Sequence, residues 1–327
     1  MPLKSFVSLL ILVVATLFGS ALGAEDLNVY FKISPRIELL RPFADPIDLS
    51  LLITGADGRP VKQGSVAIRV DAPAPGRFFS TDFPLVEGTL LNEMRLSLRQ
   101  GRANWKYLFP IRGEYRLAVD VVADGGRKAS KTFSFKVREN QEKWLALCAF
   151  SAALFILGFA AGRIFTGTRE RTASLIAMAL LSGFAASLNA QPGGAAGAAG
   201  LEIEPATVGK ASMLHWSRTS ADDANRTGFL TLTITHLEKQ KVVFAVEKVP
   251  VAREWSMKFH FPDGAEYRVV AFVQVPGEEP IRYQQLVSVT GVEPPMKAMV
   301  PALSYFLAVI VLGLGAGRWS KRRAGSQ

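Results

Sequence analysis

The residues whose chemistry could serve a metal are three histidines and two methionines, all in the second half of the chain. Imidazole and thioether groups form a ligand set that suits copper. His236 falls on the apolar side at the end of a predicted strand, and His260 falls on the polar side of another. Exposed, convergent His236 and His260 side chains would favour a copper site, whereas a buried or divergent arrangement would favour a protein-interaction module. The alternative to a metal site is that these are ordinary surface or edge histidines. The candidate ligands are Met213, His215, His236, Met257 and His260.

Catalytic motifs are absent from the sequence. It contains no GxSxG, HExxH or phosphate-binding glycine loop, and its carboxylates are scattered along polar strand faces. We therefore expect a non-enzymatic protein without catalytic residues and without a cofactor, copper being the alternative. The single cysteine, Cys148, excludes a disulfide within the chain.

Three phenylalanines, Phe78, Phe79 and Phe83, fall in a predicted long connection between strands. Exposed apolar clusters of this kind often mark partner-binding surfaces. The alternative is that these rings plug the end of a β-sandwich. The sequence therefore offers them as a candidate partner-binding patch.

Four apolar segments indicate a membrane protein. Residues 1–24 combine Lys4, an apolar stretch and small residues, which is typical of a secretory signal peptide. Segments 143–163 and 297–317 are long enough for transmembrane helices. Segment 173–190 is shorter and resembles a signal sequence, so it is either a further transmembrane helix or is cleaved near Ala190.

The net charge of +10 belongs mainly to the flanks of these segments. Basic residues cluster in 164–172 and in 318–327, which the positive-inside rule places in the cytoplasm. This distribution argues against a nucleic-acid partner. It predicts a protein of the bacterial inner membrane with residues 25–142 and 201–296 in the periplasm, the latter following a Gly/Ala linker at 191–200.

Small residues recur at helix-packing spacing in two of the apolar segments. Gly158 and Gly162 form one GxxxG pair, and Gly313 and Gly317 form the other. Such pairs let helix backbones approach closely. They predict either a packed helix pair within one chain or a homodimer, the alternative being the general abundance of glycine in membrane helices.

The two exported segments have the residue pattern of β-strands joined by turns. Short runs with alternating apolar residues, such as 28–33, 47–53, 115–121 and 230–235, are separated by Gly/Asp turns. We expect an all-β fold of two immunoglobulin-like β-sandwiches plus transmembrane helices. Glu114-Tyr115-Arg116 matches Glu266-Tyr267-Arg268, and 157–163 matches 312–318, so the chain also has the pattern of an internal duplication.

The stretches Asp57-Gly58-Arg59-Pro60-Val61 and 113–119 resemble bacterial periplasmic immunoglobulin-like modules, including the YtkA-like group. The resemblance implies a non-catalytic envelope module, in some members linked to metal handling. The metal role does not carry over to the first exported segment, which contains no histidine.

Together these patterns predict a membrane-tethered periplasmic binding or scaffold protein. Its expected partners are the lipid bilayer and another envelope protein. The alternative is a copper-binding accessory or assembly factor that uses the histidines and methionines of the second exported segment.

Overall fold

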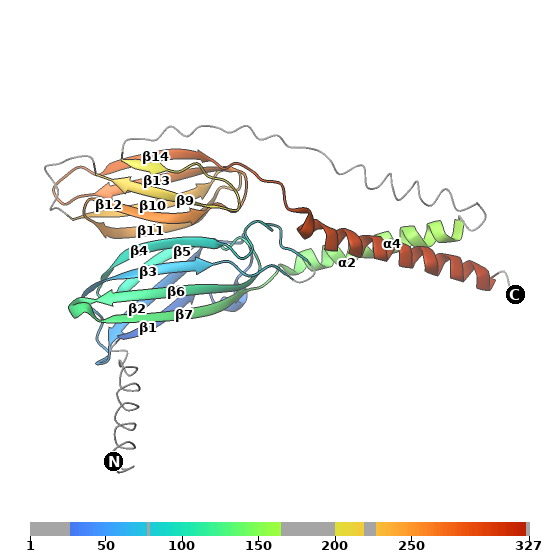
Figure 1. Cartoon of the computed structure of the whole chain (residues 1–327), viewed down its shortest axis with the longest axis horizontal. Coiled ribbons are helices and arrows are strands. Elements are labelled where there is room, and N and C mark those ends of the chain that lie inside the picture. The colour runs from blue at the N-terminus through green and yellow to red at the C-terminus, as the bar shows by residue number, and fades with distance from the viewer. Residues whose placement is uncertain (1–26, 77–78, 165–199, 219–226, 325–327) are drawn as a thin grey trace, which may run out of the picture.

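The computed structural model describes residues 27–76, 79–164, 200–218 and 227–324. The predicted signal peptide, the segment 173–190, and nearly all of the loop 164–172 and the linker 191–200 lie outside the described residues. The described part is mostly antiparallel β-structure from which two long helices extend (Figure 1).

The strands fall into two groups, a first half at 27–137 and a second half at 200–288. Most of these strands form because their side chains alternate between a buried inner face and an exposed outer face. Glycines in the turns, such as Gly125 with φ 74°, allow the chain to reverse direction. The first half contains β1 (Leu27–Ser34), η1 (Ile37–Leu39), β2 (Ile47–Gly55), β3 (Gln63–Asp71), β4 (Leu90–Arg99), β5 (Arg102–Tyr107), β6 (Gly113–Ala123), η2 (Asp124–Gly126) and β7 (Lys128–Val137). The second half contains β8 (Leu201–Ile203), β9 (Ala211–Ser217), β10 (Gly228–His236), β11 (Lys241–Val251), β12 (Glu254–His260), β13 (Glu266–Gln274) and β14 (Ile281–Ser288).

Strand pairing runs across the boundary between the halves. β5 pairs with β11, placing Tyr107 opposite Phe244, and β4 pairs with β12, placing Met94 opposite Met257. One row of strands is therefore β1-β2-β5-β11-β10-β13-β14, and the other is β7-β6-β3-β4-β12-β9-β8. The rows connect at the β4–β5 turn through the pair Arg99 and Arg102.

The two rows share one hydrophobic core that includes buried residues from both halves. At the junction, the ring centroid of Phe259 lies 5.8 Å from that of Phe244 and 6.3 Å from that of Tyr107. Burying such rings is worth about 25 cal/mol per Å² of apolar surface removed from water. Separating the halves would expose these rings, so the halves stabilise each other.

Two helices, α2 (Gln141–Ile164) and α4 (Met296–Ala324), are long and apolar enough to cross a membrane. Only 11% and 6% of their most apolar windows are buried, unlike the core helix of a soluble protein. The helices leave the same end of the β-structure and lie side by side (Figure 1). Their far ends carry Arg163 on α2 and Lys321, Arg322 and Arg323 on α4.

Candidate binding groove

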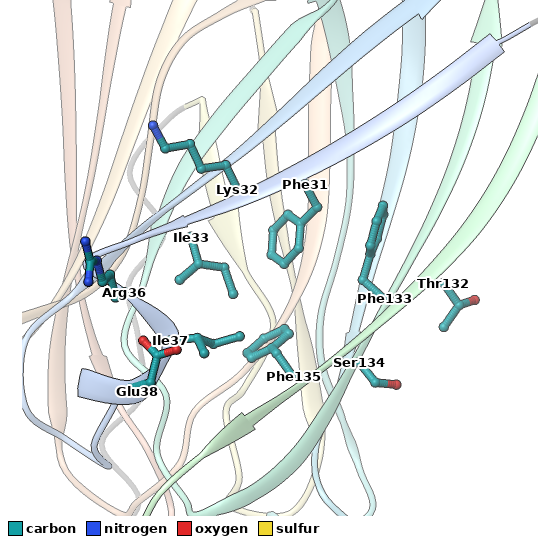
Figure 2. Close-up of a pocket in the computed structure, with 10 residues that line it drawn as sticks. All are labelled: Phe31, Lys32, Ile33, Arg36, Ile37, Glu38, Thr132, Phe133, Ser134 and Phe135. Carbon is teal, nitrogen blue, oxygen red and sulfur yellow. The ribbon is translucent and has the colours of Figure 1, made fainter.

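A groove of 780 Å³ opens at the edge of the first half, where β1 and β7 face each other. β1 is the outer strand of one row and β7 is the outer strand of the other, so no further strand of the described part closes the layers there. Figure 2 shows the groove with its lining residues. These are Phe31, Lys32, Ile33, Arg36, Ile37, Glu38, Thr132, Phe133, Ser134 and Phe135.

The floor of the groove is apolar. The ring centroid of Phe31 lies 5.3 Å from that of Phe133 and 5.9 Å from that of Phe135, so the ring bridges the two layers. Ile33 and Ile37 point into the same space (Figure 2). Along β1 the inner positions change from buried at the start of the strand to half-buried at Phe31 and Ile33. The layers therefore separate toward the end of β1, which leaves apolar side chains partly open to solvent.

Lys131 directly precedes Thr132, the first residue of β7 that lines this groove. It occupies an inner-face position of β7, where its neighbours at alternate positions are apolar. Its Nζ donates a hydrogen bond of 3.1 Å to the Val29 carbonyl and lies 5.3 Å from the Phe133 ring centroid. The bond shows that the Val29 carbonyl points away from β2, along the free edge of β1. Inward-pointing charges of this kind are a common way to cover an exposed sheet edge.

The rim of the groove is polar and mainly basic. Lys32 and Arg36 lie on the β1 side beside Glu38, and β7 contributes the hydroxyls of Thr132 and Ser134. An apolar floor with a polar rim suits a ligand that has apolar side chains and exposed polar groups. An extended polypeptide segment has both.

The predicted metal ligands lie elsewhere, in the second half. His260 is only 1% exposed. Its Nε2 accepts a 3.1 Å hydrogen bond from the Gly209 backbone N–H, and its Nδ1 lies 3.1 Å from Thr89 Oγ1. Burial lowers the pKa of His260 to about 4, although a backbone hydrogen bond to Leu90 opposes the shift. The imidazole is therefore neutral at physiological pH.

Although His260 falls on the polar side of its strand, its side chain is buried. Its side chain does lie on the side opposite Phe259, but the segments containing Thr89 and Gly209 cover it. Alternation along a strand cannot reveal such covering because the covering segments are distant in sequence.

His236 is fully buried and belongs to a hydrogen-bonded cluster with Asp263. Its Nε2 lies 3.1 Å from Asp263 Oδ2, and its Nδ1 accepts a 3.3 Å bond from the Lys239 backbone N–H. Asp263 also accepts a 2.7 Å bond from Lys239 Nζ and one from the Tyr267 hydroxyl. Burial alone would raise the pKa of Asp263, but the bonds from Lys239, Tyr267 and His236 lower it overall.

The other candidate ligands point in different directions. Met213 and His215 are half-buried on the outer face of β9, whereas Met257 is 1% exposed on the inner face of β12. Among the described residues, no group of three or more His, Cys, Asp or Glu side chains is placed to hold a metal ion.

Two of the three predicted patch phenylalanines make contacts within the chain. Phe79 packs edge-on against Tyr305 of α4, with ring centroids 5.5 Å apart, and Phe83 packs against Phe43 at 5.1 Å. Phe78 lies outside the described residues. An ion pair between Lys143 of α2 and Asp82 adds to the same contact. This connection therefore ties the β-structure to the helices.

The glycine pairs meet between α2 and α4 of the same chain. A Cβ built on Gly158 would lie 2.5 Å from the Ile310 carbonyl oxygen, and one on Gly162 would lie 3.1 Å from Leu314 Cα. On α4, Gly313 and Gly317 likewise approach the backbone of α2 at Phe159. Close backbone contact of this kind is what GxxxG spacing permits.

The groove residues were not singled out from the sequence. The run 28–33 indicates that Phe31 and Ile33 share an inner face, but nothing local indicates that this face stays partly open. Lys131 is the one available signal, because a charge at an apolar position of the strand ending at Val137 indicates an edge.

No family model matches this sequence, and no curated protein matches it either. Among solved structures, the chain is similar to the PmoD soluble domain from Methylocystis sp., at 10% identity and a TM-score of 0.24, over 36% of this chain and 94% of that one. It is also similar to PorU from Porphyromonas gingivalis, at 8% identity and a TM-score of 0.27, over 83% of this chain and 24% of that one. A third is the Yersinia pseudotuberculosis adhesin InvE, at 10% identity and a TM-score of 0.22, over 82% and 61%. Scores this low assign no activity to the chain.

Proposed function

We propose that this chain is a non-catalytic binding and scaffold protein of the bacterial inner membrane, and that its periplasmic β-structure holds an extended segment of another envelope protein in the groove between β1 and β7. The groove is the observation that carries this proposal. It combines an apolar floor, a polar rim and a free strand edge in one place.

The mode of binding follows from the edge of β1. Lys131 Nζ donates a hydrogen bond to the Val29 carbonyl on the free side of β1. Backbone N–H and C=O groups at alternate positions of a strand point to the same side. Phe31 and Ile33 therefore offer their backbone groups to the same free edge. A partner segment would add to β1 as a further strand and place its apolar side chains on Phe31 and Phe133, which is the physics of β-strand addition.

The two helices support the proposed membrane attachment and its orientation. Both leave the same end of the β-structure, and their basic residues, such as Arg163 and Arg322, lie at the far ends. The positive-inside rule would place those ends in the cytoplasm and the β-structure in the periplasm. The signal-like sequence at 1–24 is consistent with export.

We also propose that the two halves are immunoglobulin-like copies of one ancestral unit. Tyr115 near the start of β6 and Tyr267 near the start of β13 each hydrogen-bond four residues upstream, to Ile111 and Asp263. The junction is reciprocal as well, because β4 pairs with β12 while β11 pairs with β5. Two copies related by a twofold axis and joined edge to edge through these strands would give this arrangement.

Copper binding is the weaker alternative. The ring nitrogens of His236 and His260 already contact protein groups, and both side chains are buried. A metal would have to break those contacts, so the geometry favours structural histidines.

Site-specific photo-crosslinking in native membranes tests the proposal. A photoreactive phenylalanine analogue is placed at Ile33 in the groove and, as a control, at the exposed Phe272 on β13. We expect a discrete adduct from Ile33 only, and we expect Phe133→Asp, made in the Ile33-labelled chain, to reduce it at least several-fold. The matched variant Phe272→Asp should leave it unchanged. Equal adducts at both positions, or an adduct that Phe133→Asp leaves intact, would rule out the groove as the binding site.

A further inference from the structure

The short helix η1 lies close to the point where the chain enters α2. The backbone N–H of Arg138 donates a 3.2 Å hydrogen bond to the carbonyl of Leu40, which directly follows η1. Arg138 is three residues before Gln141, the first residue of α2. Because a chain extends by at most about 3.6 Å per residue, Arg138 lies within roughly 11 Å of the start of the helix, and η1 ends one residue before the Leu40 carbonyl to which Arg138 donates.

Two large apolar side chains of η1 are partly open to solvent, Leu39 on the surface and Ile37 while lining the groove. Ile37 is 37% exposed and Leu39 is 64% exposed, whereas Leu40 is buried and fixes η1 to the core. Arg41 donates to the Glu38 and Leu40 carbonyls, at 2.8 and 2.9 Å, and so holds this turn in shape. The backbone that carries Ile37 and Leu39 is therefore held in a fixed conformation.

Basic residues surround this apolar pair. Arg36, Arg41 and Arg138 lie in or beside it, and Glu38 is the acidic residue within η1. Exposed apolar side chains flanked by arginines match the interface of an anionic bilayer, where the apolar groups enter the boundary of the acyl chains and the guanidinium groups meet phosphates.

The length of α2 places this surface at the right depth. At about 1.5 Å per residue, its 24 residues span roughly 36 Å, which exceeds a hydrocarbon core of about 30 Å. Because its first turn carries Glu142 and Lys143, that end of the helix, with the exposed Trp144, falls in the headgroup region, where tryptophan is favoured.

We propose that Ile37 and Leu39 insert into the bilayer surface, with Arg36, Arg41 and Arg138 on the lipid phosphates, so that η1 is a second membrane contact of the β-structure. This contact would fix the tilt of the β-structure on its helices. Because Ile37 also lines the groove, one end of the groove would open at the membrane surface.

Fluorescence quenching by brominated lipids tests this contact in the full chain. The chain carries Cys148→Ser and is reconstituted in nanodiscs of phosphatidylcholine and phosphatidylglycerol. A fluorophore is attached through Glu38→Cys in η1 or, as the control, through Val122→Cys. Val122 is also exposed, at 42%, but lies at the end of β6 opposite the helices.

We expect lipid bromines to quench the Glu38 label several-fold more than the Val122 label. Ile37→Asp with Leu39→Asp, added to the Glu38-labelled chain, should bring quenching down to the Val122 level while the thermal midpoint stays unchanged. Equal quenching at the two sites would overturn the proposal. So would quenching that survives the double substitution, because tethering alone would then explain it.

Discussion

Gly158 on α2 and Gly313 on α4 lie directly against each other. A Cβ built on Gly158 would be 3.3 Å from Gly313 Cα, and one built on Gly313 would be 3.2 Å from Gly158 Cα. The two backbones thus meet without side chains between them. This contact holds together the two helices that carry the β-structure.

A larger side chain at Gly158 should push the helices apart. We expect Gly158→Leu to lower cross-linking by a short bifunctional maleimide between Ser151→Cys and Tyr305→Cys several-fold in a Cys148→Ser chain, because the Ser151 and Tyr305 side chains meet across the helix pair, with their hydroxyls 3.2 Å apart. Gly315→Leu is the matched control, since a Cβ there meets nothing within 4 Å. Unchanged cross-linking in Gly158→Leu would show that the helices are not held by this contact.

The Tyr115 hydroxyl should contribute measurably to stability. It donates a 2.6 Å bond to the Ile111 carbonyl and accepts a 3.1 Å bond from the Ile111 N–H, in a fully buried site. Tyr115→Phe leaves both backbone groups unsatisfied, so we expect a loss of about 1–3 kcal/mol in the free energy of unfolding. Denaturant titration in mild detergent measures it, with Tyr30→Phe at an exposed site as the control. Equal stability of the two variants would contradict this role.

Asn92 should be a point of instability at the junction of the halves. It is fully buried opposite Phe259, and neither Nδ2 nor Oδ1 has a hydrogen-bond partner. Replacing an unsatisfied buried amide by an apolar group removes a penalty of about 1–3 kcal/mol. We therefore expect Asn92→Leu to raise the thermal midpoint and Asn104→Leu, at an exposed site of β5, to leave it unchanged. A lower midpoint in Asn92→Leu would mean that the amide stabilises the junction.

Stability should fall as the pH drops below the ordinary pKa of histidine. His260 has a pKa of about 4 in the folded chain against 6.5 in the unfolded chain, so the unfolded state binds more protons between these values. The contribution of neutral His260 to the free energy of unfolding is complete above about pH 6.5. It declines as the pH falls to about 4, by roughly 3 kcal/mol in total. We expect His260→Gln to flatten the pH dependence of unfolding in this window and His215→Gln to leave it steep. A steep profile in His260→Gln would assign the effect to other groups.

Local patterns in the sequence were sufficient to predict the β-rich class and the two long helices. The start of β2 and most of β6 place apolar residues at the inner positions and mainly polar residues at the outer ones, because one face is buried and the other is solvated. The uncharged run between Lys143 and Arg163 likewise depends only on neighbouring residues. These features need no knowledge of what packs against them.

The junction between the halves could not be predicted in this way. β5 and β11, which pair with each other across it, were not recognised as strands. β5 is short and carries basic residues on its outer face, and β11 begins as a nearly continuous apolar run, because it is buried on both sides there. Their pairing depends on contacts between residues more than a hundred positions apart. The open floor around Phe31 depends on equally distant contacts.

Cysteine accessibility tests most directly whether both halves stand together on the periplasmic face of the membrane. Single cysteines are introduced by Val122→Cys in the first half, Phe272→Cys in the second and Ala324→Cys at the end of α4, each with Cys148→Ser. The cells are treated with a membrane-impermeant maleimide after the outer membrane is permeabilised. We expect labelling at positions 122 and 272 and protection at 324 until the cells are lysed. Labelling at only one of the two β-structure positions, or at 324 in intact cells, would contradict the proposed arrangement.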